Sequence, residues 1–247
     1  MPEAEDDVYF PNGCDNAVAG SDEDATALTS FTTQSDYTGT IGSATAGKPT
    51  YLQIAATTIN LAGTGKAYID VDATTTLNVT GASSSGLYLI SSDTITTLNI
   101  NIAGGTLYLA TLPGEAITIT TLNISGSGTV YIGSGAAITT INHAGCTVYN
   151  AGNLTTLTQT GGDFHQTGTA TLGTGTIKGG TLYYNSNGTI TTLTVQDTGT
   201  VDFDGDNRPV TVTTTNAYRT GRLVFDTNRV TFTNKPDPKE GMTLQAQ

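Results

Sequence analysis

The sequence is poor in helix-forming residues and in the side chains that build most reactive sites. Its 247 residues include no tryptophan, two cysteines and 12% charged residues. Ala, Leu, Glu, Lys and Arg are too scarce to fill long helices, which excludes a helical bundle and a coiled coil. Cys14 and Cys146 lie far apart and provide neither a disulfide framework nor the CxxC spacing of a metal site.

The sequence also lacks a membrane-spanning run and a secretory signal, and both absences bear on where the protein is expected in the cell. No run approaches the ~20 apolar residues of a membrane-spanning helix, so we expect no membrane partner. The opening MPEAEDDVYF lacks the basic and apolar regions of a secretory signal, so we expect synthesis as a soluble cytoplasmic product. The net charge of −12 disfavours binding to nucleic acid, because phosphate neutralisation needs a basic surface.

Threonine and glycine dominate what is present, with 52 and 30 residues, and they occur in a repeat. A group of the form Gly-Thr-apolar-aromatic-apolar recurs nine times at intervals of 16 to 23 residues, as in GTLYL (105–109) and GTVYI (128–132). A second group alternates with it, as in TTLNI (96–100) and TTLTV (191–195). Each group is short and alternates apolar with polar residues, which is typical of a half-exposed β-strand.

A period near 20 with short strands and glycine turns predicts an all-β fold, a parallel β-solenoid of about nine coils. An antiparallel sandwich or barrel also has recurring strands, but it does not require near-identical strands at coil spacing. Stacking places equivalent residues above one another, so we expect a buried ladder of Leu98, Leu122, Ile141 and Leu157. The predicted organisation is an acidic cap or docking segment (1–47), the solenoid (48–233) and a C-terminal arm (234–247).

With its TTLN and GTVY coils, the chain from about residue 50 to 233 resembles the right-handed parallel β-helix proteins. The opening DDVYFPNG (6–13), the YTGTIG group (37–42) and the repeats are similar to structural proteins encoded by tailed bacteriophages. Such proteins serve as decoration (cement) proteins on the capsid shell, or as spikes and fibres, usually as trimers. The resemblance implies a virion location after synthesis in the host cytoplasm, the major capsid protein as partner, and a homotrimer.

Parallel β-helices also include polysaccharide lyases and cleaving tailspikes, so carboxylate clusters matter. Asp70 and Asp72 share one strand face, but alternating solvated positions explain them as well. Glycoside hydrolysis needs two carboxyl groups across a groove. Glu115, in the LPGEA turn, is the only glutamate between residues 24 and 239. Asp93, Asp163 and Asp197 lie in separate predicted coils and could line up across them, although nothing in the sequence places them together.

The metal candidates are Asp202, Asp204 and Asp206, whose i, i+2, i+4 spacing resembles the start of a calcium loop. Gly205 is misplaced for such a loop, and Thr213 stands where the bidentate glutamate is expected. An acidic turn after a strand is the alternative, and we expect no cofactor.

Aromatic residues recur at coil spacing and predict a stacked ladder. If it faces outward it would offer a surface for sugar or for a partner, whereas a structural stack between coils is the favoured interpretation. Its members are Tyr68, Tyr88, Tyr108, Tyr131 and Tyr149. His143 and His165 appear at matching places in neighbouring coils, without a nucleophile beside them. Cys146 occupies the place that glycine holds in sister repeats.

The terminal regions carry opposite charge and are the predicted partner-binding parts. Residues 1–47 hold nine acidic and no basic residues, whereas residues 208–247 hold six of the nine basic residues. The candidate contact residues are Glu3, Glu5, Asp6, Asp7, Arg219, Arg222, Arg229, Lys235 and Lys239. We expect a non-enzymatic virion structural protein that stabilises a capsid shell. The alternative is a tailspike or adhesin that binds or cleaves host polysaccharide.

Overall fold

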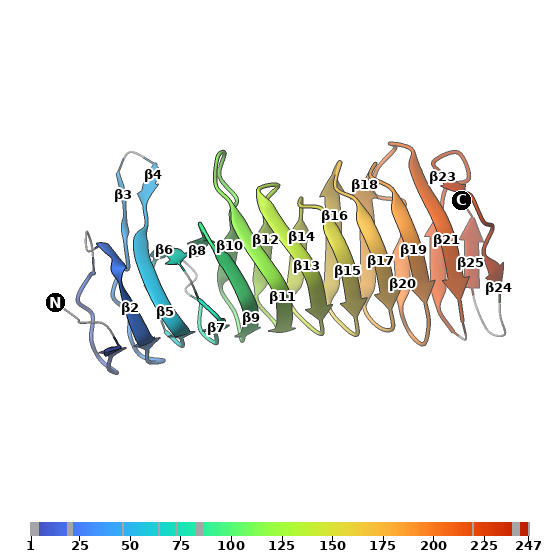
Figure 1. Cartoon of the computed structure of the whole chain (residues 1–247). Helices are drawn as coiled ribbons and strands as arrows, with labels where there is room; N and C mark the ends of the chain where they lie inside the picture. Colours follow the sequence, from blue (N-terminus) through green and yellow to red (C-terminus); the bar gives the residue numbers. More distant parts are fainter. Residues whose placement is uncertain are drawn as a thin grey trace. The chain divides into compact units, whose positions relative to one another are not determined.

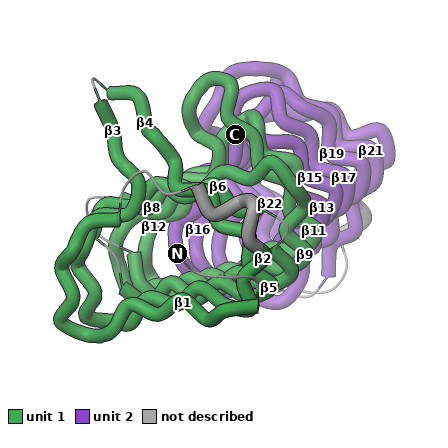
Figure 2. The backbone as a smooth tube through the Cα atoms, turned by 60° about the vertical axis from the view of Figure 1, so that its left-hand side comes forward, with its two compact units in different colours: residues 1–137 green, residues 138–247 purple. Residues whose placement is uncertain are grey.

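The computed structural model describes residues 5–18, 22–45, 47–63, 65–72, 74–82, 86–218, 220–238 and 243–246. The described residues contain strands, turns and bends and no helix, and hence no helix able to cross a membrane. The chain is a parallel β-solenoid of about 11 turns, which confirms the predicted fold class and roughly the predicted coil number. It divides into unit 1 (residues 1–137) and unit 2 (residues 138–247), coloured separately in Figure 2.

In unit 1 each strand pairs in parallel with the equivalent strand of the next coil. One column runs β1–β2–β5–β7–β9–β11 and the other β5–β6–β8–β10–β12, with β5 contributing to both. An antiparallel hairpin, β3–β4, departs from the coils, and Figure 2 shows it projecting from them. The strands are β1 (Asp7–Phe10), β2 (Asp22–Thr33), β3 (Ser43–Thr45), β4 (Lys48–Thr50), β5 (Leu52–Leu61), β6 (Ala67–Asp72), β7 (Thr76–Val79), β8 (Leu87–Ile90), β9 (Thr94–Ile102), β10 (Thr106–Leu109), β11 (Ile117–Gly126) and β12 (Thr129–Ile132).

Unit 2 repeats this plan. Its columns run β13–β15–β17–β19–β21, continued by β23 and β24, and β14–β16–β18–β20–β22–β25. The strands of the first column lie side by side in Figure 1. The strands are β13 (Ala136–His143, which begins in unit 1), β14 (Thr147–Asn150), β15 (Leu154–Gln159), β16 (Asp163–Gly168), β17 (Leu172–Ile177), β18 (Thr181–Ser186), β19 (Ile190–Val195), β20 (Thr200–Asp202), β21 (Val210–Ala217), β22 (Arg222–Phe225), β23 (Val230–Phe232), β24 (Asp237–Pro238) and β25 (Thr243–Ala246).

The interior is built from the ladders that the repeat predicted. Leu98 pairs with Leu122 in unit 1 and Ile141 with Leu157 in unit 2, and all four side chains are fully buried. Each such side chain contributes about 1.5–3 kcal/mol by leaving water. Alternation along the strand turns the next residue outward, which is why threonine and asparagine occupy the other face.

The stacked coils begin earlier and end later than the sequence indicated. β2 pairs with β5 over Ser30–Thr33, inside the segment interpreted as a cap. β25 pairs with β22 through Leu223 and Leu244, inside the segment interpreted as an arm. These strands carry weaker repeats of the motif, so the boundaries at 47 and 234 do not coincide with the ends of the stack.

Candidate functional site

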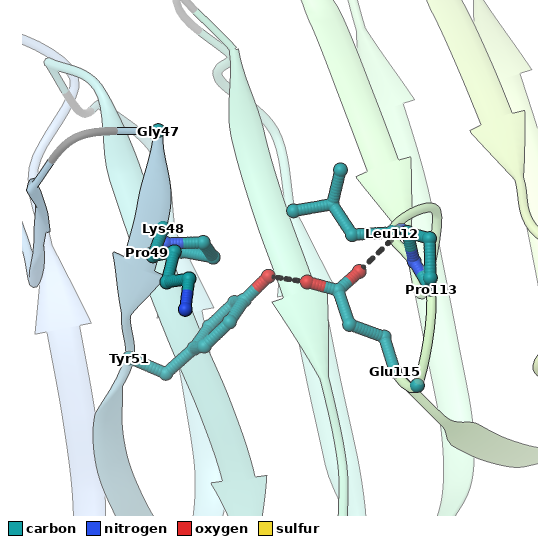
Figure 3. Close-up of a pocket in the computed structure, with 8 residues that line it drawn as sticks. Gly47, Lys48, Pro49, Tyr51, Leu112, Pro113 and Glu115 are labelled. Carbon is teal, nitrogen blue, oxygen red and sulfur yellow. Dashed lines mark hydrogen bonds between the residues drawn. The ribbon is translucent and has the colours of Figure 1, made fainter.

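Unit 1 contains an open pocket of about 440 Å³ between two excursions from the coils. One excursion is the β3–β4 hairpin, which contributes Lys48 and Pro49. The other is the turn at 112–115, which contributes Leu112 and Glu115 (Figure 3). Gly47, Tyr51, Pro113 and Gly114 complete the lining. The turn belongs to the longest repeat interval, 23 residues, so the extra length forms this wall.

A hydrogen bond from Tyr51 to Glu115 links the two walls. The Tyr51 hydroxyl donates to Oε1 of Glu115, and the Leu112 N–H donates to Oε2 at 2.8 Å (Figure 3). Burial, followed by the bond to the carboxylate, raises the pKa of Tyr51 above its ordinary value, so the phenol stays protonated and acts as donor. Leu112 is 39% exposed and gives the pocket an apolar rim.

The tyrosine ladder is a structural stack, as the favoured interpretation predicted. In unit 1 the centroids of Tyr68, Tyr88, Tyr108 and Tyr131 lie 4.5–5.3 Å apart with nearly parallel rings. Tyr51 extends the series with an edge contact to Tyr68 at 5.9 Å. This spacing leaves no room for a sugar ring between neighbouring rings, so their faces serve the protein and only their edges are presented.

Unit 2 contains a second stack, in which histidine replaces one tyrosine. His165 lies between Tyr149 and Tyr183, with centroids 4.6 Å and 4.5 Å away. His143, in contrast, points inward on β13, where it pairs in register with Gln159 and is 1% exposed. The interpretation that both histidines occupy matching places was wrong, because His143 points inward from the β13–β21 column whereas His165 points outward from the β14–β25 column. Burial lowers the pKa of both imidazoles.

An asparagine ladder covers the outer face of unit 1, and the sequence analysis missed it. Asn78 donates to Asn60 at 2.8 Å, Asn99 to Asn78 at 2.9 Å and Asn123 to Asn99 at 2.8 Å, each from Nδ2 to Oδ1. The signal was present, because each TTLN group ends in this asparagine. Stacked amides add side-chain hydrogen bonds to those of the backbone, so this face reinforces the coil.

The interior of unit 2 is more polar than the apolar ladders predicted. Asn150 donates to Gln166 at 2.8 Å, and both amides bond the carbonyl of Gly152. The single hydroxyl proton of Tyr184 is shared between the carbonyls of Gly188 at 3.0 Å and Ala170 at 3.2 Å. Buried polar groups of this kind need such partners, and their satisfaction fixes the packing of these coils.

The acidic turn after β20 does not assemble the predicted metal ligands. Oδ1 of Asp202 accepts the N–H of Asp204 at 2.8 Å. Asp206 forms an ion pair with Arg208 and accepts its Nε–H at 2.7 Å, and this contact lowers the pKa of Asp206. Among the described residues no group of three or more His, Cys, Asp or Glu side chains is placed to hold a metal.

Asp70 and Asp72 lie on one outer face of β6, as their spacing predicted, and both are half-exposed. Asp70 is held by Gln53 and the backbone of Ser92, and burial raises its pKa. The other predicted carboxyl, Glu115, is occupied by the bond from Tyr51.

The candidate partner residues divide into three groups. Glu5, Asp6 and Asp7 are exposed at the start of unit 1, where Asp7 accepts a hydrogen bond from Ser30 at 2.5 Å. Arg222 and Lys235 are exposed in unit 2. Glu3, Arg219 and Lys239 lie outside the described residues.

Arg229 does not lie at the surface as its grouping with the basic tail implied. It is 4% exposed and donates from Nε to the carbonyl of Arg208 and from Nη2 to that of Tyr184, both at 2.8 Å. A buried guanidinium of this kind ties three coils together and is removed from the set of contact residues.

Comparisons with known proteins add no relative. The sequence matches no protein-family model and no curated protein, and no solved structure matches the chain.

Proposed function

We propose that this protein is a non-enzymatic structural component of a bacteriophage virion, a decoration protein that stabilises the capsid shell. The observation that carries the proposal is that both faces of the strands, inner and outer, carry ladders of stacked side chains. Leucines fill the inside, while tyrosines and asparagines stack outside, coil upon coil. Such stacking makes a module that resists local opening, which is what a shell clamp requires.

The attachment would come from charged residues near the two ends of the chain. Glu5, Asp6 and Asp7 are exposed at one end, and Arg222 and Lys235 near the other. Each exposed ion pair contributes about 0–1 kcal/mol, so firm attachment needs many of them. A homotrimer on a symmetric shell of major capsid protein multiplies these contacts.

The experiment is to mix the purified protein with empty phage shells and measure its mass in solution and its cosedimentation. We expect a trimer that sediments with the shells and is released by salt, since exposed charges are screened. The Arg222→Glu/Lys235→Glu double variant should bind more weakly, and Lys178→Glu, an exposed lysine in the middle of unit 2, should not. A monomer without shell affinity would overturn the proposal.

The pocket favours a second candidate function, binding of a surface polysaccharide. Its tyrosine, leucine and proline walls suit the apolar face of a sugar, and Glu115 and Lys48 suit its hydroxyl groups. Binding to host glycans that is lost in Leu112→Asp and kept in Leu244→Asp, an equally exposed leucine, would support it. Release of reducing ends would further indicate cleavage.

A further inference from the structure

Unit 2 carries a regular array of threonines on the outer side of the β13–β21 column. Two outward positions, two residues apart, repeat in register on five strands. Eight of these ten positions are threonine and two are asparagine. We name this array the threonine face: Thr140, Asn142, Thr156, Thr158, Thr174, Thr176, Thr192, Thr194, Thr214 and Asn216. The strands that carry it lie side by side in Figure 1.

The array has two fixed repeat distances. Equivalent threonines on neighbouring strands lie about 4.8 Å apart, and alternate residues along one strand about 6.6 Å apart. Three successive coils present Thr-x-Thr, from Thr156, Thr174 and Thr192 onward. All ten side chains are at least partly exposed. The result is a two-dimensional grid in which eight of the ten positions combine a hydroxyl with a methyl group, and the other two, Asn142 and Asn216, carry an amide.

The hydroxyl groups of this grid are not used by the protein. Within the described residues, none of the eight threonine hydroxyls forms a hydrogen bond with the rest of the chain. The equivalent column in unit 1 behaves differently, because Asn60, Asn78, Asn99 and Asn123 bond one another. Unit 1 thus keeps one row of threonines in register beside its asparagines, Thr58, Thr76, Thr97 and Thr121, whereas the unit 2 face offers hydroxyl groups in both of its rows.

The absence of charge identifies the kind of surface that fits. No acidic or basic residue occupies any of the ten positions, although the whole chain carries −12. Outer strand faces usually carry charged residues for solubility, and β-propensity alone explains threonine but not the exclusion of lysine and glutamate. An uncharged face whose hydroxyl groups lie at fixed distances is complementary to an uncharged lattice whose hydrogen-bonding groups lie at similar distances.

We propose that unit 2 binds ice through the threonine face. The oxygen rows on the faces of hexagonal ice repeat in two directions at distances close to those of the grid. Hydroxyls hold water molecules at lattice positions, while the methyl groups keep disordered liquid water out of the gaps. Each contact is weak, and attachment follows from many contacts in register. This inference is independent of the proposed virion role.

The test measures the gap between the freezing and melting temperatures of a single ice crystal in solutions of the full chain. It also measures incorporation of labelled protein into growing ice. Thr174→Tyr places a large ring in the centre of the face, and Thr174→Ser removes only the methyl group. The control, Thr200→Tyr, makes the same change on an outward, half-exposed position of the other strand column. Thermal unfolding reports whether each variant is folded.

We expect a freezing gap and incorporation for the unmodified protein and for Thr200→Tyr. Thr174→Tyr should lose both and Thr174→Ser should lose part. Any of three results overturns the inference: no ice effect in the unmodified protein, equal loss in Thr200→Tyr and Thr174→Tyr, or retention on insoluble cellulose without an ice effect. The last result would reassign the face to a neutral polysaccharide.

Discussion

The asparagine ladder of unit 1 gives the most direct test of how the coils are held together. Asn99 takes part in two ladder bonds, donating to Asn78 at 2.9 Å and accepting from Asn123 at 2.8 Å. The matched substitution is Asn99→Thr, because threonine occupies the same outward column at Thr158 and Thr176 in unit 2. The change therefore keeps a residue that the fold accepts and removes only the amide bonds.

The expected loss follows from the bonds removed. Each net hydrogen bond contributes about 1 kcal/mol, so two bonds contribute about 2 kcal/mol. Threonine recovers up to about 1 kcal/mol through its higher strand propensity. The free energy of unfolding should therefore fall by about 1 kcal/mol.

The assay is urea unfolding followed by tyrosine fluorescence, together with hydrogen exchange of the backbone amides of β7, β9 and β11. Exchange is needed because repeat proteins open locally and do not always unfold in one step. Asn60→Thr is the control, because Asn60 accepts one bond at 2.8 Å and its own donor reaches Thr32 at 3.3 Å. It should lose less stability than Asn99→Thr, because its second hydrogen bond is longer. If Asn99→Thr is as stable as the original chain, or if both variants lose the same amount, the ladder does not stabilise the coils.

Three further predictions concern buried groups. Leu98→Ala should cost about 2–5 kcal/mol in chemical unfolding because it leaves a cavity in a closed interior, while Leu112→Ala, at an exposed leucine, should cost under about 1 kcal/mol. Arg229→Met leaves the carbonyls of Tyr184 and Arg208 without donors and should cost about 2–4 kcal/mol. Arg208→Met, at an exposed side chain, should leave the stability nearly unchanged. Burial lowers the folded pKa of His143, and hydrogen bonds to the backbone of Cys146 and Gly145, then the charge of Asp163, partly offset this shift. The stability contributed by the neutral imidazole is therefore present above pH ~6.5 and is lost as pH falls. Urea unfolding at pH 7.5 and 5 should show this loss, and His143→Gln, which copies Gln159 of the next coil, should reduce it.

The sequence was sufficient to predict the coil because it contains two periods that indicate the same structure: the two-residue alternation of a strand and the repeat near 20 residues of a solenoid. Alternation within TTLNI separates Leu98 from Asn99, and the repeat near 20 residues places Leu98 beside Leu122. The positive φ of Cys146, +65°, likewise agrees with its place in a glycine position, since Gly162 and Gly180 have φ near +70°. These features depend on residues separated by about one repeat, and a single sequence already shows that separation.

The pocket could not be predicted in this way because its walls are a hairpin and a turn that interrupt the regular repeat. The wall at Leu112–Glu115 comes from an insertion, and its partner Tyr51 lies 64 residues away from Glu115. The burial of Arg229 is similar, because its acceptor on Tyr184 is 45 residues earlier and two coils away. The lengthened interval between 105 and 128 marked where an excursion would occur, but not what it would contact.

Among the described residues, the last strand of each column in unit 2 pairs with a neighbour on one side only. A terminal coil exposes unpaired backbone groups that would recruit other strands. The first strand column ends in β24 (Asp237–Pro238), where proline has no N–H to offer, so that edge is blunted. The second ends in β25 (Thr243–Ala246), which has no proline and leaves Leu244 39% exposed above Leu223. Pro238→Thr should therefore increase concentration-dependent association in light scattering, whereas Leu244→Lys should decrease whatever association the original chain has. If neither substitution changes the scattering, the edge strands of this unit do not govern association.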